Sequence, residues 1–110
     1  MIKTYNKLVR DKIPQIIKAN EGGAPKTKIL PDQEFIIELF KKLKEEAKEL
    51  IETRGNKPEL IKEIGDVYEV IDSIIEYYNI DKGEIMRLKR ERKRKRGGFR
   101  KRIFLESVNN

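Results

Sequence analysis

Residues 32–78 read DQEFIIELFKKLKEEAKELIETRGNKPELIKEIGDVYEVIDSIIEYY, and this stretch decides the fold. Its apolar residues recur with helical spacing on both sides of a short break at Gly55. Asp32 is a residue type that caps helix starts, and glycine is common just beyond helix ends. The pattern therefore predicts a first long helix that is capped by Asp32, runs to about Arg54 and stops at Gly55.

The second half of this stretch predicts another long helix. Asn56 is followed three residues later by Glu59, which is the spacing of a capping box, and the helical pattern then continues to about Tyr78. Two long helices joined by a tight loop pack antiparallel. We therefore expect an all-α fold whose core is a helical hairpin. A hairpin of two long helices with an unmatched apolar face is expected to have a partner, with dimer and tetramer both open.

Shorter elements are expected on both sides of the hairpin. Pro14 fits the first turn of a short helix that Gly22-Gly23 ends. Asp81 starts a further helix that breaks at Gly97-Gly98 and is followed by a short strand or an extended tail. We expect residues 1–110 to form one domain.

The net charge of +7 is unevenly distributed. Residues 87–102 hold eleven Lys or Arg and one Glu, a net +10, which leaves −3 for the rest of the chain. The protein is thus predicted to be a mildly acidic helical body with a basic helix and tail over residues 82–110. Such a segment favours partners that carry phosphate, and nucleic acid is one of them.

Cysteine and histidine are both absent. Their absence excludes disulfides, thiolate metal sites, catalytic triads that contain histidine and most zinc sites. The apolar runs are far shorter than the ~20 residues that span a bilayer, and no signal-peptide hydrophobic region follows Met1. We expect a cytoplasmic protein without membrane association.

Five carboxylates in two clusters are the candidate functional residues: Glu45, Glu46 and Glu49, then Glu63 and Asp66. At about 100° per residue, Glu63 lies inside an apolar stripe and Asp66 at its border. Glu46 touches the edge of the apolar stripe of the preceding helix, and Glu49 lies one turn further on. Unpaired buried anions are costly, so a cation between the helices is expected. The alternative is a solvated helix surface with local Lys–Glu pairs, which is common in such chains.

Clustered carboxylates without nitrogen or sulfur ligands select hard cations, so Mg²⁺ is the expected metal and Mn²⁺ a substitute. Magnesium bound in this way usually serves phosphate chemistry, which predicts hydrolysis of a phosphoanhydride. No Walker-type glycine loop is present, so a P-loop enzyme is excluded.

The two clusters match a known signature, EExxE followed by ExxD, with thirteen residues between them. In this respect the chain resembles the all-α nucleoside triphosphate pyrophosphatases, the MazG-like and phosphoribosyl-ATP pyrophosphohydrolase-like superfamily. The segments YNKLVRDKIP (residues 5–14) and RGGFRKRIFL (residues 96–105) are similar to the ends of a small single-domain branch of that group. The resemblance implies a four-helix-bundle-type domain that is completed by dimerisation. It also implies a Mg²⁺-dependent enzyme that cleaves nucleotides between the α- and β-phosphates.

The resemblance also assigns roles to the carboxylates. It gives Glu46, Glu49, Glu63 and Asp66 to the metal, with Glu45 as a supporting group. The predicted catalytic carboxylates are accordingly Glu45, Glu46 and Glu49.

Basic and aromatic side chains are the candidates for contacting the nucleotide. The predicted phosphate-binding residues are Lys7, Arg10, Arg96, Arg100 and Arg102, with ordinary surface charge as the alternative. Arg100 stands where the branch is expected to have an acidic residue, which leaves the partner of the tail open. Tyr78 is the candidate for base stacking, although a core or interface role is the common one for such a tyrosine.

Three other functions stay open beside nucleotide house-cleaning. One is the phosphoribosyl-ATP pyrophosphohydrolase step of histidine biosynthesis. Another is a nucleic-acid-binding module built on KRERKRKR, residues 89–96. The third is a helical interaction protein that keeps the fold without the chemistry. Base and sugar preference cannot be read from these residues.

Overall fold

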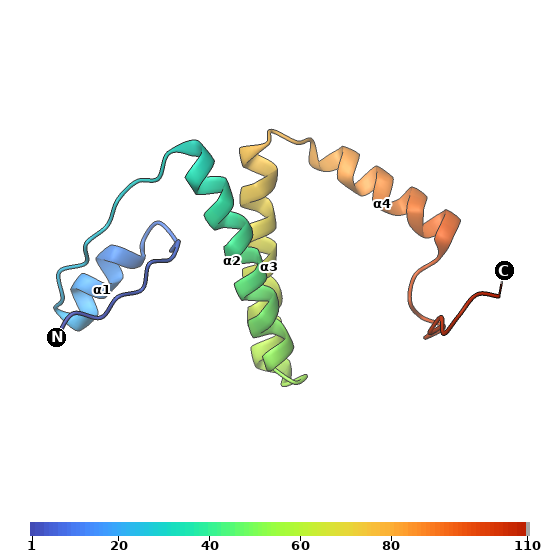
Figure 1. Cartoon of the computed structure of the whole chain (residues 1–110), viewed down its shortest axis with the longest axis horizontal. Helices are drawn as coiled ribbons and strands as arrows, with labels where there is room; N and C mark the ends of the chain where they lie inside the picture. The colour runs from blue at the N-terminus through green and yellow to red at the C-terminus, as the bar shows by residue number, and fades with distance from the viewer. Residues whose placement is uncertain (110) are drawn as a thin grey trace. The chain divides into compact units, whose positions relative to one another are not determined.

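The computed structural model describes residues 1–109, apart from the side chain of Glu21. This part of the chain contains no strand and forms four helices (Figure 1): α1 (Ile13–Glu21), α2 (Asp32–Glu52), α3 (Lys57–Tyr77) and α4 (Lys82–Arg96). The all-α prediction is confirmed. The contacts fall into two units, Met1–Tyr78 and Asn79–Asn110, which are described separately below. That the whole chain forms one domain stays a prediction.

The first unit is built on an antiparallel hairpin of α2 and α3, which lie side by side (Figure 1). In the connection, the backbone is left-handed at Arg54 (φ 51°) and Gly55 (φ 81°), so α2 ends at Glu52, two residues before the predicted end. The side chain of Asn56 accepts a hydrogen bond from the backbone N–H of Glu59 at 3.2 Å. This cap, which the sequence predicts, satisfies one of the free donors at the start of α3.

The other end of the hairpin differs from the prediction in one detail. Asp32 is the first residue of α2 and makes no capping bond through its side chain, because Pro31, with extended backbone (φ −63°, ψ 159°), holds the cap position. Asp32 still places a negative charge in the first turn, where the helix dipole favours it. The Tyr77 hydroxyl donates to the Asp32 carbonyl at 3.3 Å, and the Tyr77 ring contacts Phe35 with 5.9 Å between centroids. These contacts join the start of α2 to the end of α3.

The core between the two helices is small. Among the described residues, the only buried apolar ones are Leu39 of α2 and Val70 of α3, and neither is completely shielded from solvent. Both are among the apolar residues whose helical spacing predicts the two long helices. Two carboxylates, Glu46 and Glu63, are buried as deeply as these aliphatic residues. The centre of the hairpin is therefore partly anionic.

Each helix carries a second set of apolar residues. Each member directly follows, in sequence, a residue of the stripe that faces the other helix. We call this set the second apolar face: Ile37, Phe40 and Ile51 of α2, with Ile61, Ile64, Tyr68, Ile71 and Ile75 of α3. On α3 these residues alternate at spacings of three and four, as in a coiled-coil seam. Because the helices run antiparallel, a shift of one residue turns both seams toward the same side of the hairpin. Tyr68 is 64% exposed and Ile51 77% exposed, so the single chain leaves this face largely uncovered.

The remaining elements follow their sequence signals. Helix α1 has Pro14 in its first turn and is followed directly by Gly22, whose φ of 65° is left-handed. In the second unit, Asp81 accepts from the backbone N–H of Gly83 at 2.9 Å, and α4 ends at Gly97. Of the two alternatives for the residues after Gly97-Gly98, the strand does not form in the described part of the chain. None of the described helices combines the length and the apolar character that crossing a membrane requires.

Candidate metal centre

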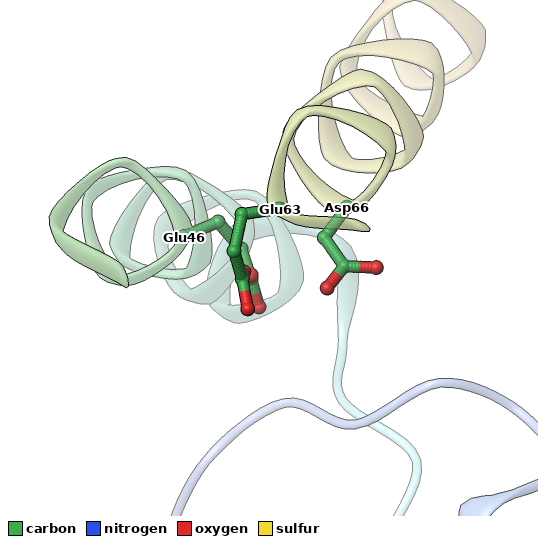
Figure 2. A group of neighbouring side chains, drawn as sticks. All are labelled: Glu46, Glu63 and Asp66. Carbon is green, nitrogen blue, oxygen red and sulfur yellow. The ribbon is translucent and has the colours of Figure 1, made fainter. Parts of the chain in front are cut away.

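Three of the five predicted carboxylates meet between α2 and α3 (Figure 2). Glu46 comes from α2, and Glu63 and Asp66 come from α3, with one oxygen of each lying within 4.8 Å of the others. Residues three apart on a helix share a surface, so α3 presents its two carboxylates together. The antiparallel packing places Glu46 beside them. The prediction that the two acidic clusters lie next to each other therefore holds for these three residues, which we call the carboxylate trio.

Two members of the trio are buried and incompletely paired. Glu46 is 8% exposed and Glu63 is 7% exposed. The Oε2 atoms of both side chains are buried, and neither has a hydrogen-bond partner among the described residues. A buried charged oxygen without a partner is costly, and a cation between the two carboxylates removes that cost. An all-oxygen donor set of this kind fits Mg²⁺ or Mn²⁺.

The surroundings of Glu46 act against its ionised form. Burial raises the pKa of the Glu46 carboxyl above its ordinary value, and the negative charges of Glu49 and Asp66 raise it further. The ammonium of Lys42 opposes these effects and lowers the pKa. Without a metal, the site therefore holds Glu46 in an environment that favours the proton.

Each carboxylate of the trio also pairs with a basic residue of the chain. Lys42 Nζ lies 3.6 Å from Glu46 Oε1, and Lys62 Nζ lies 3.3 Å from Glu63 Oε1. Arg10 Nη2 donates to Asp66 Oδ1 at 2.8 Å. Glu46 and Glu63 thus direct Oε1 at a lysine and keep Oε2 inside the hairpin. The trio converges, as expected. The contacts of Lys42 and Lys62 are local Lys–Glu pairs, which the alternative interpretation includes, whereas the contact of Arg10 with Asp66 was not foreseen.

The other two predicted carboxylates lie beside the trio. Glu45 is half-buried and forms ion pairs with Lys42, at 3.5 Å, and with Lys7, at 3.8 Å. Glu49 is near enough to raise the pKa of Glu46, and it lines, together with Glu63, a cavity of about 360 Å³ toward the loop end of the hairpin. A direct metal bond from Glu49 stays a prediction.

A second cavity, of about 340 Å³, opens on the other side of the trio. Glu46 and Asp66 line it from the helices, and residues 8–11 of the N-terminal segment form part of its wall. Its volume lies at the lower end of the range for small-molecule sites, roughly 300–1,000 Å³. Arg10 belongs to this wall, so a predicted phosphate-binding residue does lie at the site. In the structure, however, it contacts Asp66.

The remaining predicted residues are not brought to the trio by any described contact. Arg96, Arg100 and Arg102 belong to the second unit, and their role in phosphate binding stays a prediction. Tyr78 is exposed and meets the Tyr77 ring edge-on, with 5.0 Å between centroids. Base stacking by Tyr78 likewise stays a prediction.

No model of a known protein family, no curated protein and no solved structure matches this chain. The resemblance to the MazG-like superfamily therefore stays a prediction from the motifs, and the site is interpreted from its own geometry.

Proposed function

We propose that the protein is a Mg²⁺-dependent nucleotide pyrophosphohydrolase that releases a nucleoside monophosphate and pyrophosphate. The observation that carries the proposal is the pair of buried, unpartnered oxygens on Glu46 and Glu63 next to Asp66. Helix packing alone gives no reason to bury two carboxylates where aliphatic side chains would stabilise the hairpin more. A site that must hold a hard cation does give one.

The metal would supply neutralisation of phosphate charge and would lower the pKa of water. In this proposal Glu46, Glu63 and Asp66 hold the metal. In place of the metal bond that the resemblance gives to Glu49, the proposal lets this residue, one turn from Glu46 on α2, accept a proton from the attacking water. Glu45 orients that water. Cleavage between the α- and β-phosphates is taken from the resemblance, because the carboxylates alone indicate only metal-assisted phosphate hydrolysis.

The N-terminal segment would bind the phosphates of the substrate. Arg10 and Lys7 already lie beside the carboxylates, at 2.8 Å from Asp66 and 3.8 Å from Glu45. A bound cation would weaken both ion pairs by neutralising the carboxylates. The freed side chains could then bind phosphate oxygens across the cavity, with the guanidinium of Arg10 suited to a bidentate contact.

The proposal includes a homodimer. The second apolar face is too exposed, and the core of Leu39 and Val70 too small, for the hairpin to be stable by itself. A second copy of the chain that packs on this face would complete a four-helix arrangement and leave the cavities of the trio on the opposite side of the hairpin.

The test is release of pyrophosphate from a panel of canonical, deoxy and damaged nucleoside triphosphates, with Mg²⁺ or Mn²⁺. Glu63→Gln keeps the shape of the side chain and should abolish release. Glu76→Gln, an exposed position on the same helix, is the matched control and should be fully active. Failure of the wild-type protein to release pyrophosphate from any nucleotide on the panel with either metal would refute the proposal.

A further inference from the structure

Helix α4 concentrates positive charge far more than the rest of the chain. Eight of the ten residues from Arg87 to Arg96 are Lys or Arg. The second unit as a whole has twelve Lys or Arg against four Asp or Glu, a net +8, whereas the first unit is close to neutral at −1. The excess positive charge of the protein thus lies in the unit that does not contain the trio.

These cations surround the helix. At about 100° per residue, the eight basic side chains leave no gap wider than about 80° around the axis. Helix α4 buries no residue, and its last turn alone holds Lys93, Arg94, Lys95 and Arg96. A helix that lies on a membrane surface needs an apolar face opposite its basic one, and α4 has none in its basic part. The distribution fits a partner that presents negative charge on several sides of the helix.

Most of this charge is not balanced within the protein. Glu91, the one acidic residue among these ten, pairs with Arg87 at 3.4 Å and with Lys95 at 3.1 Å. The other six cations have no ion pair in the part of the chain that the structure describes: Lys89, Arg90, Arg92, Lys93, Arg94 and Arg96. Like charges three and four residues apart destabilise a helix. A polyanion that neutralises them would stabilise α4.

We propose that α4 binds double-stranded DNA by lying in the major groove, without reading a specific sequence. An α-helix about 10–12 Å across fits the major groove, which is ~12 Å wide. With cations on all sides, α4 can contact the phosphates of both strands that border the groove. The major groove of double-stranded RNA is too narrow and deep for this contact. DNA is therefore the favoured duplex.

The test uses the full chain, without nucleotide or divalent metal, and a fluorescently labelled 20-base-pair DNA whose anisotropy reports binding. Six free cations that contact phosphates predict a slope of about −5 for log K against log salt. Affinity should then fall about 1,000-fold between 50 and 200 mM salt. Duplex RNA of the same length and vesicles of anionic phospholipid at matched charge are the competing partners.

A charge-matched pair of variants separates α4 from general electrostatics. Replacing Arg90, Arg92, Lys93 and Arg94 with Gln should weaken DNA binding at least about 100-fold and make the slope shallower by about four. Replacing Lys12, Lys18, Lys26 and Lys28 with Gln removes the same charge from the first unit and should change affinity less than about threefold. Circular dichroism of both variants checks that helix content is kept.

The proposal would be overturned by no binding to DNA at 50 mM salt, by RNA bound as tightly as DNA, or by vesicles bound more tightly than DNA. An equal loss of affinity in the two variants would also overturn it, because α4 would then have no special role. None of these measurements depends on pyrophosphohydrolase activity. The proposal can therefore fail while the proposed enzyme function stands, and the converse also holds.

Discussion

The guanidinium of Arg10 donates a hydrogen bond to Asp66 Oδ1 at 2.8 Å and so ties the N-terminal segment to α3 across 56 residues of sequence. Asp66 is also a member of the carboxylate trio. A metal ion at the trio and the guanidinium of Arg10 would therefore compete for the same carboxylate. Such a competition would link occupancy of the site to the position of residues 8–11, which form part of the cavity wall.

Arg10→Gln should separate the two roles of this residue. Removing the competing cation should tighten Mn²⁺ binding up to about fivefold, the range expected for a partly exposed ion pair. The same change should raise the KM for a nucleotide, because one phosphate contact is lost. Titration calorimetry with Mn²⁺ and steady-state kinetics measure the two effects, and Lys12→Gln is the control. Weaker metal binding in Arg10→Gln would contradict the competition.

Glu46→Gln should bind metal more weakly than the wild type. In the absence of metal at pH 7, it should be more stable than the wild type. Loss of one of the three ligands should weaken Mn²⁺ binding at least about 10-fold, since even residues that only support ligands contribute 10–100-fold. In the metal-free protein the pKa of Glu46 is raised above 4.5 in the folded state, so the folded state binds more protons than the unfolded state. The contribution of the Glu46 carboxyl to the free energy of unfolding is fully present below pH 4.5 and is lost as the pH rises through the raised pKa. The variant should not show this loss.

Urea unfolding in EDTA at pH 4 and pH 7 measures this difference. The drop in the free energy of unfolding between the two pH values should be smaller in Glu46→Gln than in the wild type. Glu34→Gln, an exposed position in the first turn of α2, should keep the wild-type drop. If Glu46→Gln were less stable than the wild type at pH 7 in EDTA, the carboxylate would be a stabilising structural group and not a strained ligand.

Metal should stabilise the wild-type fold. A cation that binds only the folded chain adds about 2.7 kcal/mol when its concentration is 100 times Kd. We therefore expect Mg²⁺ or Mn²⁺ to raise Tm in a concentration-dependent way, and EDTA to reverse the increase. Glu63→Gln should show little of this increase, whereas Glu76→Gln should show all of it. An equal shift in both variants would place the cation elsewhere.

The second apolar face should control assembly. Tyr68→Lys puts a charge in the middle of this face and should convert a dimer into a poorly stable monomer, detected by light scattering after gel filtration. Glu76→Lys adds a lysine to an exposed position of the same helix and should leave the mass unchanged. A wild-type chain that is monomeric at high micromolar concentration would refute the dimer.

The local elements of this fold could be predicted because their signals are local. Asn56 and Glu59 lie three residues apart, and Gly22, whose left-handed backbone follows the last residue of α1, is a glycine of the kind that commonly ends a helix. The cap at Asp32 was wrong by one position, because Pro31 already supplies the extended residue that precedes the helix. Helix periodicity also placed Glu63 on the buried side of α3, where the structure has it.

The ion pairs that the carboxylates of the trio form with basic residues could be predicted only in part. Lys42 stands four residues before Glu46, so this pair was readable from helix spacing. The contact of Arg10 with Asp66 was not, because it joins an irregular segment to a helix and depends on how the chain folds back. Glu49 and Glu46 differ by about 60° around α2. This difference is close to the accuracy of a helical projection that ignores side-chain rotamers, so the projection could not separate the positions of the two carboxylates.

On α3, Ile64 follows Glu63 directly, so the second apolar face and the carboxylates of Glu63 and Asp66 belong to one helix. Rotation of α3 about its axis cannot repack Ile61 and Tyr68 without also redirecting Glu63 and Asp66. If the second copy sets that rotation, turnover per chain should decline on dilution, even with saturating Mg²⁺ and nucleotide. Substitutions on the second apolar face would then change the reaction rate without touching the carboxylate trio.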